Sequence, residues 1–224
     1  MYDLFEGAIS YVGSGDDGEV YANKDIAVKL FLPGSDTSEM NIATLIKTVG
    51  LSAFDPEIIM IGKIDGIPAL VRENLNDIEP HHEDICERFF RYSRQRREIR
   101  RNQDKFLTRS ALNFGDIKKI ISNYAKSEAE KYDNKMRDFI PANLEENLEY
   151  AYYQYEKEGI GLEDMYCENF GLSRTGHLKF RDLSKCDIMT QLPDYPDHDI
   201  TDYILDMINR YEDRESNREK GLEI

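Results

Sequence analysis

Three polar residues in the last third of the chain have the types and spacing to hold a divalent cation. Asn169 follows Asp164 by five residues, and Asp182 follows Asn169 by thirteen. The residues between Asn169 and Asp182 form two short apolar or alternating runs around the turn residues 173–176, which is typical of a β-hairpin. A hairpin brings its ends together, so we expect Asn169 and Asp182 side by side, with Asp164 in the loop before the first strand. Converging carboxylate and amide oxygens suit Mg²⁺. The alternative is an ordinary acidic hairpin.

A second group of residues, near the N-terminus, suits phosphate. The alternating run Ile9–Val12 leads into the pattern G-x-G-x-x-G-x-V, formed by Gly13, Ser14, Gly15, Gly18 and Val20. Glycines let the backbone lie against an anion with N–H groups turned towards it. The motif also opens dinucleotide-binding folds, but there a helix follows. Here the chain continues as strand, polar turn and a second strand, Ile26–Phe31, in which Lys29 stands alone among apolar residues. Lys29 is either a phosphate ligand or a lysine whose stem lies on the sheet edge while its ammonium reaches water.

The composition is that of a folded, acidic protein. The chain has 224 residues, of which 40% are hydrophobic and 11% aromatic, enough for one core or two small lobes. A net charge of −15 argues against nonspecific nucleic-acid binding and against anionic membranes. Cys86, Cys167 and Cys186 lack C-x-x-C spacing and indicate neither a disulfide framework nor a zinc site. The N-terminal residues lack the apolar region of a signal peptide, and no run approaches the ~18 apolar residues of a membrane span. We expect a cytoplasmic protein.

Two further elements complete the N-terminal region. A helix is predicted from Ser35 or Asp36, as candidate N-caps, to Val49. Glu39 in its first turn is either a helix-dipole residue or the partner of Lys29. Residues 57–63 and 67–73 predict another hairpin, around an Asp-Gly turn.

The residues from Asp77 to Tyr155 have long, polar, helical patterns. One stretch is rich in basic residues: Arg88, Arg91, Arg94, Arg96, Arg97, Arg100, Arg101, Lys105 and Arg109. It is either a solvated helix compensated by local acids or a docking surface for an acidic partner, and the net charge disfavours an RNA contact. Further helices are predicted around residues 117–125 and from Pro141 to Tyr155, with the tyrosines of the latter in packing roles.

The order of these groups resembles that of protein kinases. The glycine pattern is followed by Ile26-Ala27-Val28-Lys29, which is similar to the V-A-I-K strand of that family, and then by the Asp164, Asn169 and Asp182 set. The stretch ENFGLSRTGHLKFRDLS is similar to the family's catalytic and magnesium loops. The run ALVREN resembles the strand that leads into the kinase hinge, which would put Arg72 at the gatekeeper position.

The resemblance implies a role for each of these residues. Gly13, Gly15 and Gly18 would cover the phosphates of ATP, Lys29 would pair with them, and Glu39 would hold Lys29. The backbone of Glu73 to Leu75 would face the adenine. Asn169 and Asp182 would bind Mg²⁺, and Asp164 would orient the substrate hydroxyl and accept its proton.

The chain also departs from the family pattern. Leu162 and Glu163 replace the usual His-Arg before the catalytic aspartate, Leu183 and Ser184 replace Phe-Gly, and no A-P-E motif follows. An activation segment regulated by phosphorylation is therefore not expected. Small kinases of bacteriophages and of bacterial effectors are built in this way, and DMYCEN resembles the catalytic loop of phage early-gene kinases. For such a protein the location would be the cytoplasm of the host.

The expectation from the sequence is an α+β, two-lobed, kinase-like fold. Residues 1–75 would form an N-lobe with a small antiparallel sheet, residues 76–212 a reduced helical C-lobe with the catalytic hairpin, and residues 213–224 a charged tail. The expected function is transfer of the γ-phosphate of ATP, with Mg²⁺, to Ser or Thr of a protein substrate, for which the acidic chain favours basic segments. A kinase-like binding module without activity and a small-molecule phosphotransferase of the same fold are the alternatives.

Overall fold

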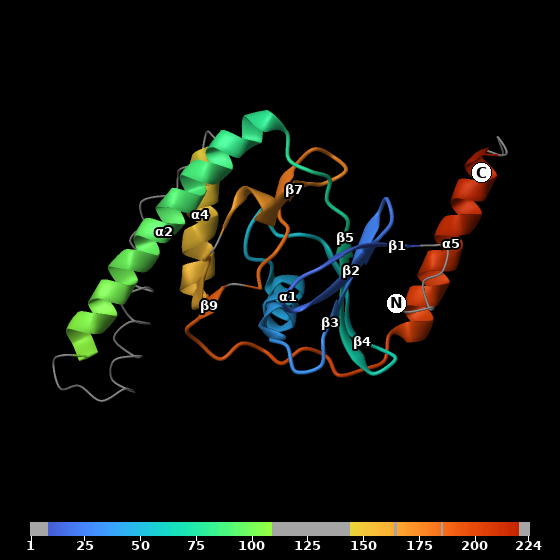
Figure 1. Ribbon diagram of the computed structural model, residues 1–224, viewed down its shortest axis with the longest axis horizontal. Coiled ribbons are helices and arrows are strands. Elements are labelled where there is room, and N and C mark those ends of the chain that lie inside the picture. The colour runs from blue at the N-terminus through green and yellow to red at the C-terminus, as the bar shows by residue number, and fades with distance from the viewer. Residues whose placement is uncertain (1–8, 109–143, 164, 185, 220–224) are drawn as a thin grey trace. The chain divides into compact units, whose positions relative to one another are not determined.

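The computed structural model describes residues 9–108, 144–163, 165–184 and 186–219, and it has two compact units (Figure 1). The first unit consists of residues 1–48, 57–74 and 193–224, and the second of residues 49–56 and 75–192. The α+β class predicted from the sequence is confirmed, and its sheet has five antiparallel strands. Among the described residues, no helix combines the length and the apolar composition needed to cross a bilayer.

The sheet of the first unit has the order β1-β2-β3-β5-β4. Its strands are β1 Ser10–Ser14, β2 Gly18–Ala22, β3 Ile26–Phe31, β4 Ile58–Ile64 and β5 Ile67–Glu73. The predicted hairpin between β4 and β5 is confirmed, and its turn residues Asp65 and Gly66 have φ angles of 50° and 79°. Both angles are positive, as a two-residue turn with the native strand twist requires.

The two faces of this sheet are covered by different helices (Figure 1). Along β3 the side chains alternate, so Ile26, Val28 and Leu30 lie on one face, in a cluster with Ile200, Ile204 and Ile208 of the C-terminal segment and α5 Thr201–Glu219. Phe31 lies on the other face, in a cluster with Met40 and Ala43 of α1 Ser38–Val49. Lys29 shares this second face. At the start of α1, the carboxylate of Asp36 accepts a hydrogen bond from the Ser38 N–H at 2.8 Å, as a capping residue does.

The C-terminal segment belongs to the first unit. Lys63 of β4 donates its N–H to His198 O at 2.8 Å, and Ile200 donates its N–H to Lys63 O at 2.8 Å. Gly62 permits this approach, because a Cβ there would lie 2.6 Å from His198 O. The sequence-based division had assigned residues up to 212 to the helical lobe and residues 213–224 to a tail. Instead residues 193–224 group with the sheet, and α5 continues to Glu219.

The second unit is built around aromatic side chains. Its elements are α2 Pro80–Thr108, α4 Leu144–Lys157, β6 Ile160–Gly161, the 3₁₀ turn η2 Cys167–Asn169, β7 Phe170–Leu172, β8 Leu178–Phe180 and β9 Asp187–Ile188. Phe89 of α2 contacts Tyr152 of α4 and Phe170 of β7, edge to face. Tyr155 of α4 meets Phe180 of β8 at 5.6 Å between ring centroids. Tyr152 and Tyr155 are fully buried, which confirms their packing role. The helix predicted around residues 117–125 and the start of the one predicted from Pro141 lie outside the described residues.

Candidate functional site

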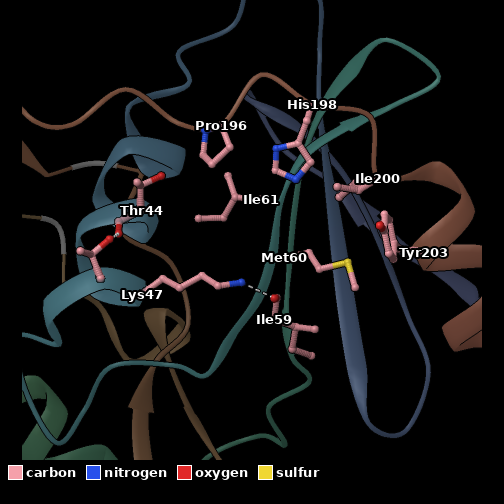
Figure 2. Close-up of a pocket in the computed structure, with 10 residues that line it drawn as sticks. Thr44, Lys47, Ile59, Met60, Ile61, Pro196, His198, Ile200 and Tyr203 are labelled. Carbon is pink, nitrogen blue, oxygen red and sulfur yellow. Dashed lines mark hydrogen bonds between the residues drawn. The ribbon is translucent and has the colours of Figure 1, made fainter.

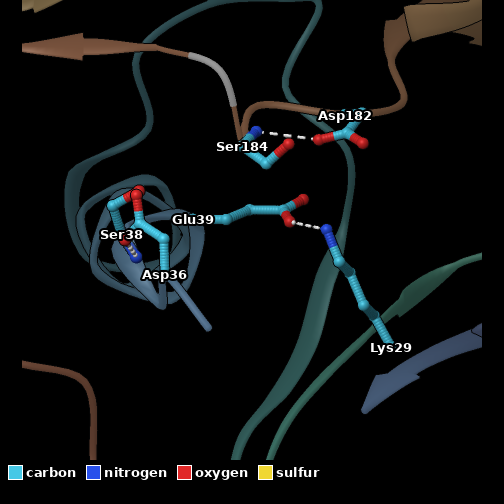
Figure 3. A network of polar contacts seen from close by, with 6 residues as sticks. All are labelled: Lys29, Asp36, Ser38, Glu39, Asp182 and Ser184. Carbon is cyan, nitrogen blue, oxygen red and sulfur yellow. Dashed lines mark hydrogen bonds and ion pairs between the residues drawn. The ribbon is translucent and has the colours of Figure 1, made fainter. Parts of the chain in front are cut away.

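A buried ion pair lies on the α1 face of the sheet. Lys29 Nζ is 2.6 Å from Glu39 Oε2, and the two side chains are 10% and 4% exposed (Figure 3). Lys29 also lies 5.1 Å from the centroid of the Phe31 ring. Of the two interpretations of Glu39, the structure supports the partner of Lys29, and the interpretation of Lys29 as a solvated edge residue is wrong. A buried ammonium requires a compensating carboxylate, so the pair with Glu39 accounts for the buried position of Lys29.

The strand register places several of the residues predicted to bind ATP close to Lys29. Val20 of β2 lies directly opposite Lys29, and Leu70 of β5 lies opposite on the other side. Ala27 precedes Lys29 by two residues and therefore shares its face, opposite Arg72. This face of β2, β3 and β5 therefore carries Val20, Ala27, Lys29, Leu70 and Arg72.

The glycine pattern forms the hairpin that joins β1 to β2. Gly15 donates its N–H to Gly18 O at 2.9 Å, and Leu32 donates its N–H to Asp17 O at 3.0 Å. A Cβ at Gly18 would lie 2.2 Å from Leu30 O, whereas a Cβ at Gly13 or Gly15 would have no atom within 4 Å. Neither Gly13 nor Gly15 has a positive φ. Packing accounts for Gly18, but neither packing nor backbone conformation accounts for the other two. Ser14 lies exposed between them.

In residues 73–75, which were expected to face an adenine, two backbone N–H groups already donate hydrogen bonds within the protein. Glu73 donates its N–H to Glu57 O at 3.0 Å, and Asn74 donates its N–H to Asp25 O at 2.9 Å. The side chain of Glu73 accepts from the Glu57 N–H at 2.8 Å, and its position opposite Ile26 puts it on the face away from Lys29. The Glu73 and Asn74 N–H groups therefore already have backbone acceptors.

The hairpin predicted between Asn169 and Asp182 is present in the second unit as β7 and β8. Phe170 pairs with Phe180, and Arg181 donates its N–H to Asn169 O at 2.6 Å, so Asn169 and Asp182 are at the same end of the hairpin. Asp182 Oδ1 accepts the Ser184 N–H at 2.8 Å, which orients the carboxylate (Figure 3). A carboxylate and an amide oxygen at one hairpin end form a donor set that suits a hard cation. Asp164, the predicted catalytic aspartate, lies outside the described residues.

The residue before Asp164 has a partner that the sequence did not indicate. Glu163 forms an ion pair with Arg97 of α2 at 2.8 Å. Their side chains are 12% and 29% exposed, respectively. The two residues are far apart in the sequence, and no local pattern relates them.

Residues 51–55 are held in the second unit by a hydrogen-bond network that sequence reasoning also missed. Tyr155 donates its hydroxyl to Asp55 Oδ1 at 2.7 Å, and Lys179 of β8 donates to the carbonyls of Ala53 and Asp55 at 3.0 and 2.9 Å. Burial, followed by the nearby Asp55 carboxylate, raises the pKa of Tyr155 well above its usual value. The hydroxyl therefore stays a donor.

Arg181 connects residues 75–77 to the same hairpin by hydrogen bonds. Its guanidinium donates to the carbonyls of Leu75 and Asn76, at 3.3 and 2.8 Å, and to the carboxylate of Asp77 at 3.1 Å. The guanidinium lies over Gly171, where a Cβ would be 3.0 Å from its nitrogens. The Arg181 guanidinium thus contacts both β7 and residues 75–77 at the hairpin end that carries Asn169 and Asp182.

None of the three cysteines forms a disulfide, and the thiol pKa is raised in two of them. Burial raises the pKa of the Cys86 thiol to about 12, and burial followed by nearby glutamates raises the pKa of Cys167.

The basic helix has local partners over its described part. Arg88 pairs with Asp84 at 3.4 Å and Arg91 with Glu87 at 3.2 Å, both one helical turn away. These pairs agree with the interpretation as a solvated helix compensated by local acids.

The first unit also has a groove that sequence reasoning did not anticipate. It has a volume of about 520 Å³ and lies between α1, the edge strand β4 and residues 196–203 (Figure 2). Its floor is apolar, with Ile59, Ile61 and Met60, and Lys47 of α1 donates to Ile59 O at 2.5 Å. None of the residues predicted to bind ATP or Mg²⁺ lines it.

No model of a known protein family matches the chain, and no curated protein matches it at a significant level.

Proposed function

We propose that the chain is a small ATP- and Mg²⁺-dependent protein kinase that phosphorylates serine or threonine. In this proposal the two units are the lobes of a kinase-like fold. The observation that carries it is the buried Lys29–Glu39 pair on the face of a five-stranded antiparallel sheet, next to a glycine hairpin. A buried charged pair is costly to maintain and is weak support for stability as such, so it suggests a functional role.

Phosphate is the ligand that best suits the first unit. The space above Gly13 and Gly15 is open, and these two glycines have no packing role that alanine could not fill. A backbone that a phosphate must approach closely has a reason to lack Cβ atoms. Lys29 would pair with the nucleotide phosphates, and Glu39 would keep its ammonium oriented.

The hairpin of the second unit provides the donor set for the metal. Asn169 and Asp182 would hold Mg²⁺, which when bound neutralises charge on the phosphates. The Ser184 N–H already fixes one carboxylate oxygen of Asp182. Asp164 would orient the substrate hydroxyl and accept its proton. The ion pair between Glu163 and Arg97 would hold the chain next to Asp164 without a phosphorylated activation segment.

A kinase-like binding module is the second candidate, because one observation favours it. The N–H groups of Glu73 and Asn74, in the stretch expected to face the adenine, already donate to Glu57 and Asp25. Such a module would bind ATP weakly or not at all.

The test is transfer of labelled phosphate from ATP to a generic basic acceptor protein and to proteins of a bacterial lysate. We expect wild-type protein to label an acceptor, and Asp164→Ala and Asp182→Ala each to abolish labelling. Glu168→Gln, an exposed acid next to Asn169, is the matched control and should retain activity. Lys29→Ala should remove the thermal stabilisation by ATP and Mg²⁺. Stabilisation without transfer would indicate that the acceptors tested are the wrong substrates. Neither stabilisation nor transfer would refute the kinase and favour the binding module.

A further inference from the structure

Three potential metal ligands meet at the start of α2, in the sequence Glu79-Pro80-His81-His82. One donor atom from each of Glu79, His81 and His82 lies within 4.8 Å of the others. His81 Nδ1 is 3.2 Å from Glu79 Oε2, and the two imidazole rings are 3.9 Å apart between centroids. Two consecutive side chains on a helix normally point in directions about 100° apart, so the close approach of these rings is a feature of this turn.

The backbone of this turn holds Glu79 close to His82. Pro80 is the first residue of α2, where its fixed φ is compatible with the helix and its missing N–H is not needed. His82 donates its N–H to Glu79 O at 2.8 Å, which closes the turn. All three donors therefore come from four consecutive residues, and bringing them together requires no long-range folding.

The environment of the cluster favours an external ligand. Glu79 and His81 are 62% and 66% exposed, so an ion can reach them from solvent and water can complete its coordination. His82 is partly buried, and its Nδ1 is shielded from solvent without a hydrogen-bond partner among the described residues. A buried polar atom left in this way is rare in proteins and calls for an explanation.

We propose that Glu79, His81 and His82 form a site for a divalent transition-metal ion of the zinc class. Imidazole nitrogens with one carboxylate suit zinc and its neighbours, whereas Mg²⁺ prefers oxygen ligands. Tetrahedral zinc holds its ligand atoms roughly 3.3 Å apart. The Glu79–His81 separation is close to this value, and the exposed side chains can rotate to bring the third donor in from at most 4.8 Å.

The carboxylate has a specific role in this site. The N-terminus of a helix carries partial positive charge, which disfavours a cation. Glu79 offsets this field, so two histidines alone would bind weakly. The site is distinct from the proposed Mg²⁺ site at Asn169 and Asp182, and it does not depend on the proposed kinase activity.

The test is titration of the metal-free full-length protein with Zn²⁺ by calorimetry and with Co²⁺ by visible absorption. We expect one equivalent to bind, with cobalt bands that lack sulfur-to-metal charge transfer. His81→Ala and Glu79→Gln, at exposed positions, should each weaken binding by roughly tenfold or more. His198→Ala, another exposed histidine, is the matched control and should leave the affinity unchanged, as should Cys167→Ser.

Each of the other outcomes would overturn the proposal. The absence of saturable binding by wild-type protein would show that the cluster is not a site. Equal affinity of wild type and His81→Ala would move the site elsewhere, and sulfur-to-cobalt charge transfer lost in Cys167→Ser would assign it to a thiol. Circular dichroism and thermal unfolding of each variant establish that it is folded.

Discussion

At the residue scale, the glycines of the N-terminal motif are of two kinds. Gly18 is required by packing, because a Cβ there would meet Leu30 O at 2.2 Å. Gly13 and Gly15 have open space above them and unexceptional φ angles. Gly18 is therefore needed for the stability of the sheet, whereas Gly13 and Gly15 are candidates for a role in ligand binding.

Substitution of each glycine by alanine distinguishes the two kinds, because stability and ATP affinity should change in different variants. Gly18→Ala should lower the free energy of unfolding by about 1–3 kcal/mol, because the backbone of β3 must move. Gly13→Ala and Gly15→Ala should leave it within about 1 kcal/mol of wild type, since alanine also restricts the unfolded chain. If phosphates approach this hairpin, the affinity for ATP should fall roughly tenfold in the latter two, about 1.4 kcal/mol. Denaturant unfolding and calorimetry measure the two quantities. Equal losses of stability in all three variants would contradict this division.

At the element scale, the β7–β8 hairpin depends on α4 and on residues 51–55. Phe180 of β8 is fully buried and contacts Tyr155, Phe170 and Phe54. The hydroxyl of Tyr155 donates to Asp55, whose carboxylate also accepts the N–H groups of Leu51 and Ser52. The position of Asn169 and Asp182 therefore rests on side chains more than a hundred residues apart in the sequence.

Removing the Tyr155 hydroxyl tests this dependence. Tyr155→Phe should lower the free energy of unfolding by about 1–3 kcal/mol, because the buried Asp55 carboxylate loses a donor. Tyr153→Phe, on the same helix but less buried, is the control and should have an effect within about 0.5 kcal/mol.

The same pair predicts a pH dependence. The pKa of Tyr155 is raised by folding, so above the ordinary tyrosine pKa of about 10 the unfolded chain loses this proton while the folded chain keeps it. Stability should therefore fall as the pH rises through that range, and Tyr155→Phe should reduce the slope. A slope unchanged by the substitution would contradict this account of the Tyr155–Asp55 bond.

At the scale of the whole molecule, the C-terminal residues complete the first unit. Ile200, Ile204 and Ile208 bury the face of the sheet that is opposite to Lys29. β3 is buried along its whole length, and this requires a cover on both faces. Residues 193–224 thus belong to the same unit as the N-terminal sheet, although residues 75–192, which precede them, belong to the second unit.

A single substitution in α5 should therefore weaken the N-terminal sheet. Ile204 is fully buried, and Ile204→Ala should cost about 2–5 kcal/mol and speed amide hydrogen exchange in β2, β3 and β5. Tyr203→Ala changes the neighbouring residue, which is 65% exposed, and should leave this exchange nearly unchanged. Normal protection of β3 in Ile204→Ala would refute a role of α5 in this unit.

Local patterns in the sequence were sufficient for several elements. The Asp65-Gly66 turn, the hairpin of β7 and β8, and the helix that follows Asp36 each depend on residues within a few positions of one another. Turn chemistry, capping and side-chain periodicity act over that range, so they can be predicted without the fold. The pairing of Lys29 with Glu39 could be predicted as one of two alternatives for the same reason, because β3 is followed directly by α1. The role of Asp164 stays a prediction.

Only the tertiary structure decided which distant surfaces meet. The sequence of α5 does not specify which surface this helix covers, because burial of apolar area is not directional. The same holds for the Arg97–Glu163 ion pair and the Tyr155–Asp55 hydrogen bond, whose partners are separated by long stretches of chain. Such contacts form because the packed cores bring the groups together, and their sequence separation leaves no periodic signal. The sequence by itself thus determined the local elements and the candidate chemistry, and packing within each unit decided how those elements are held.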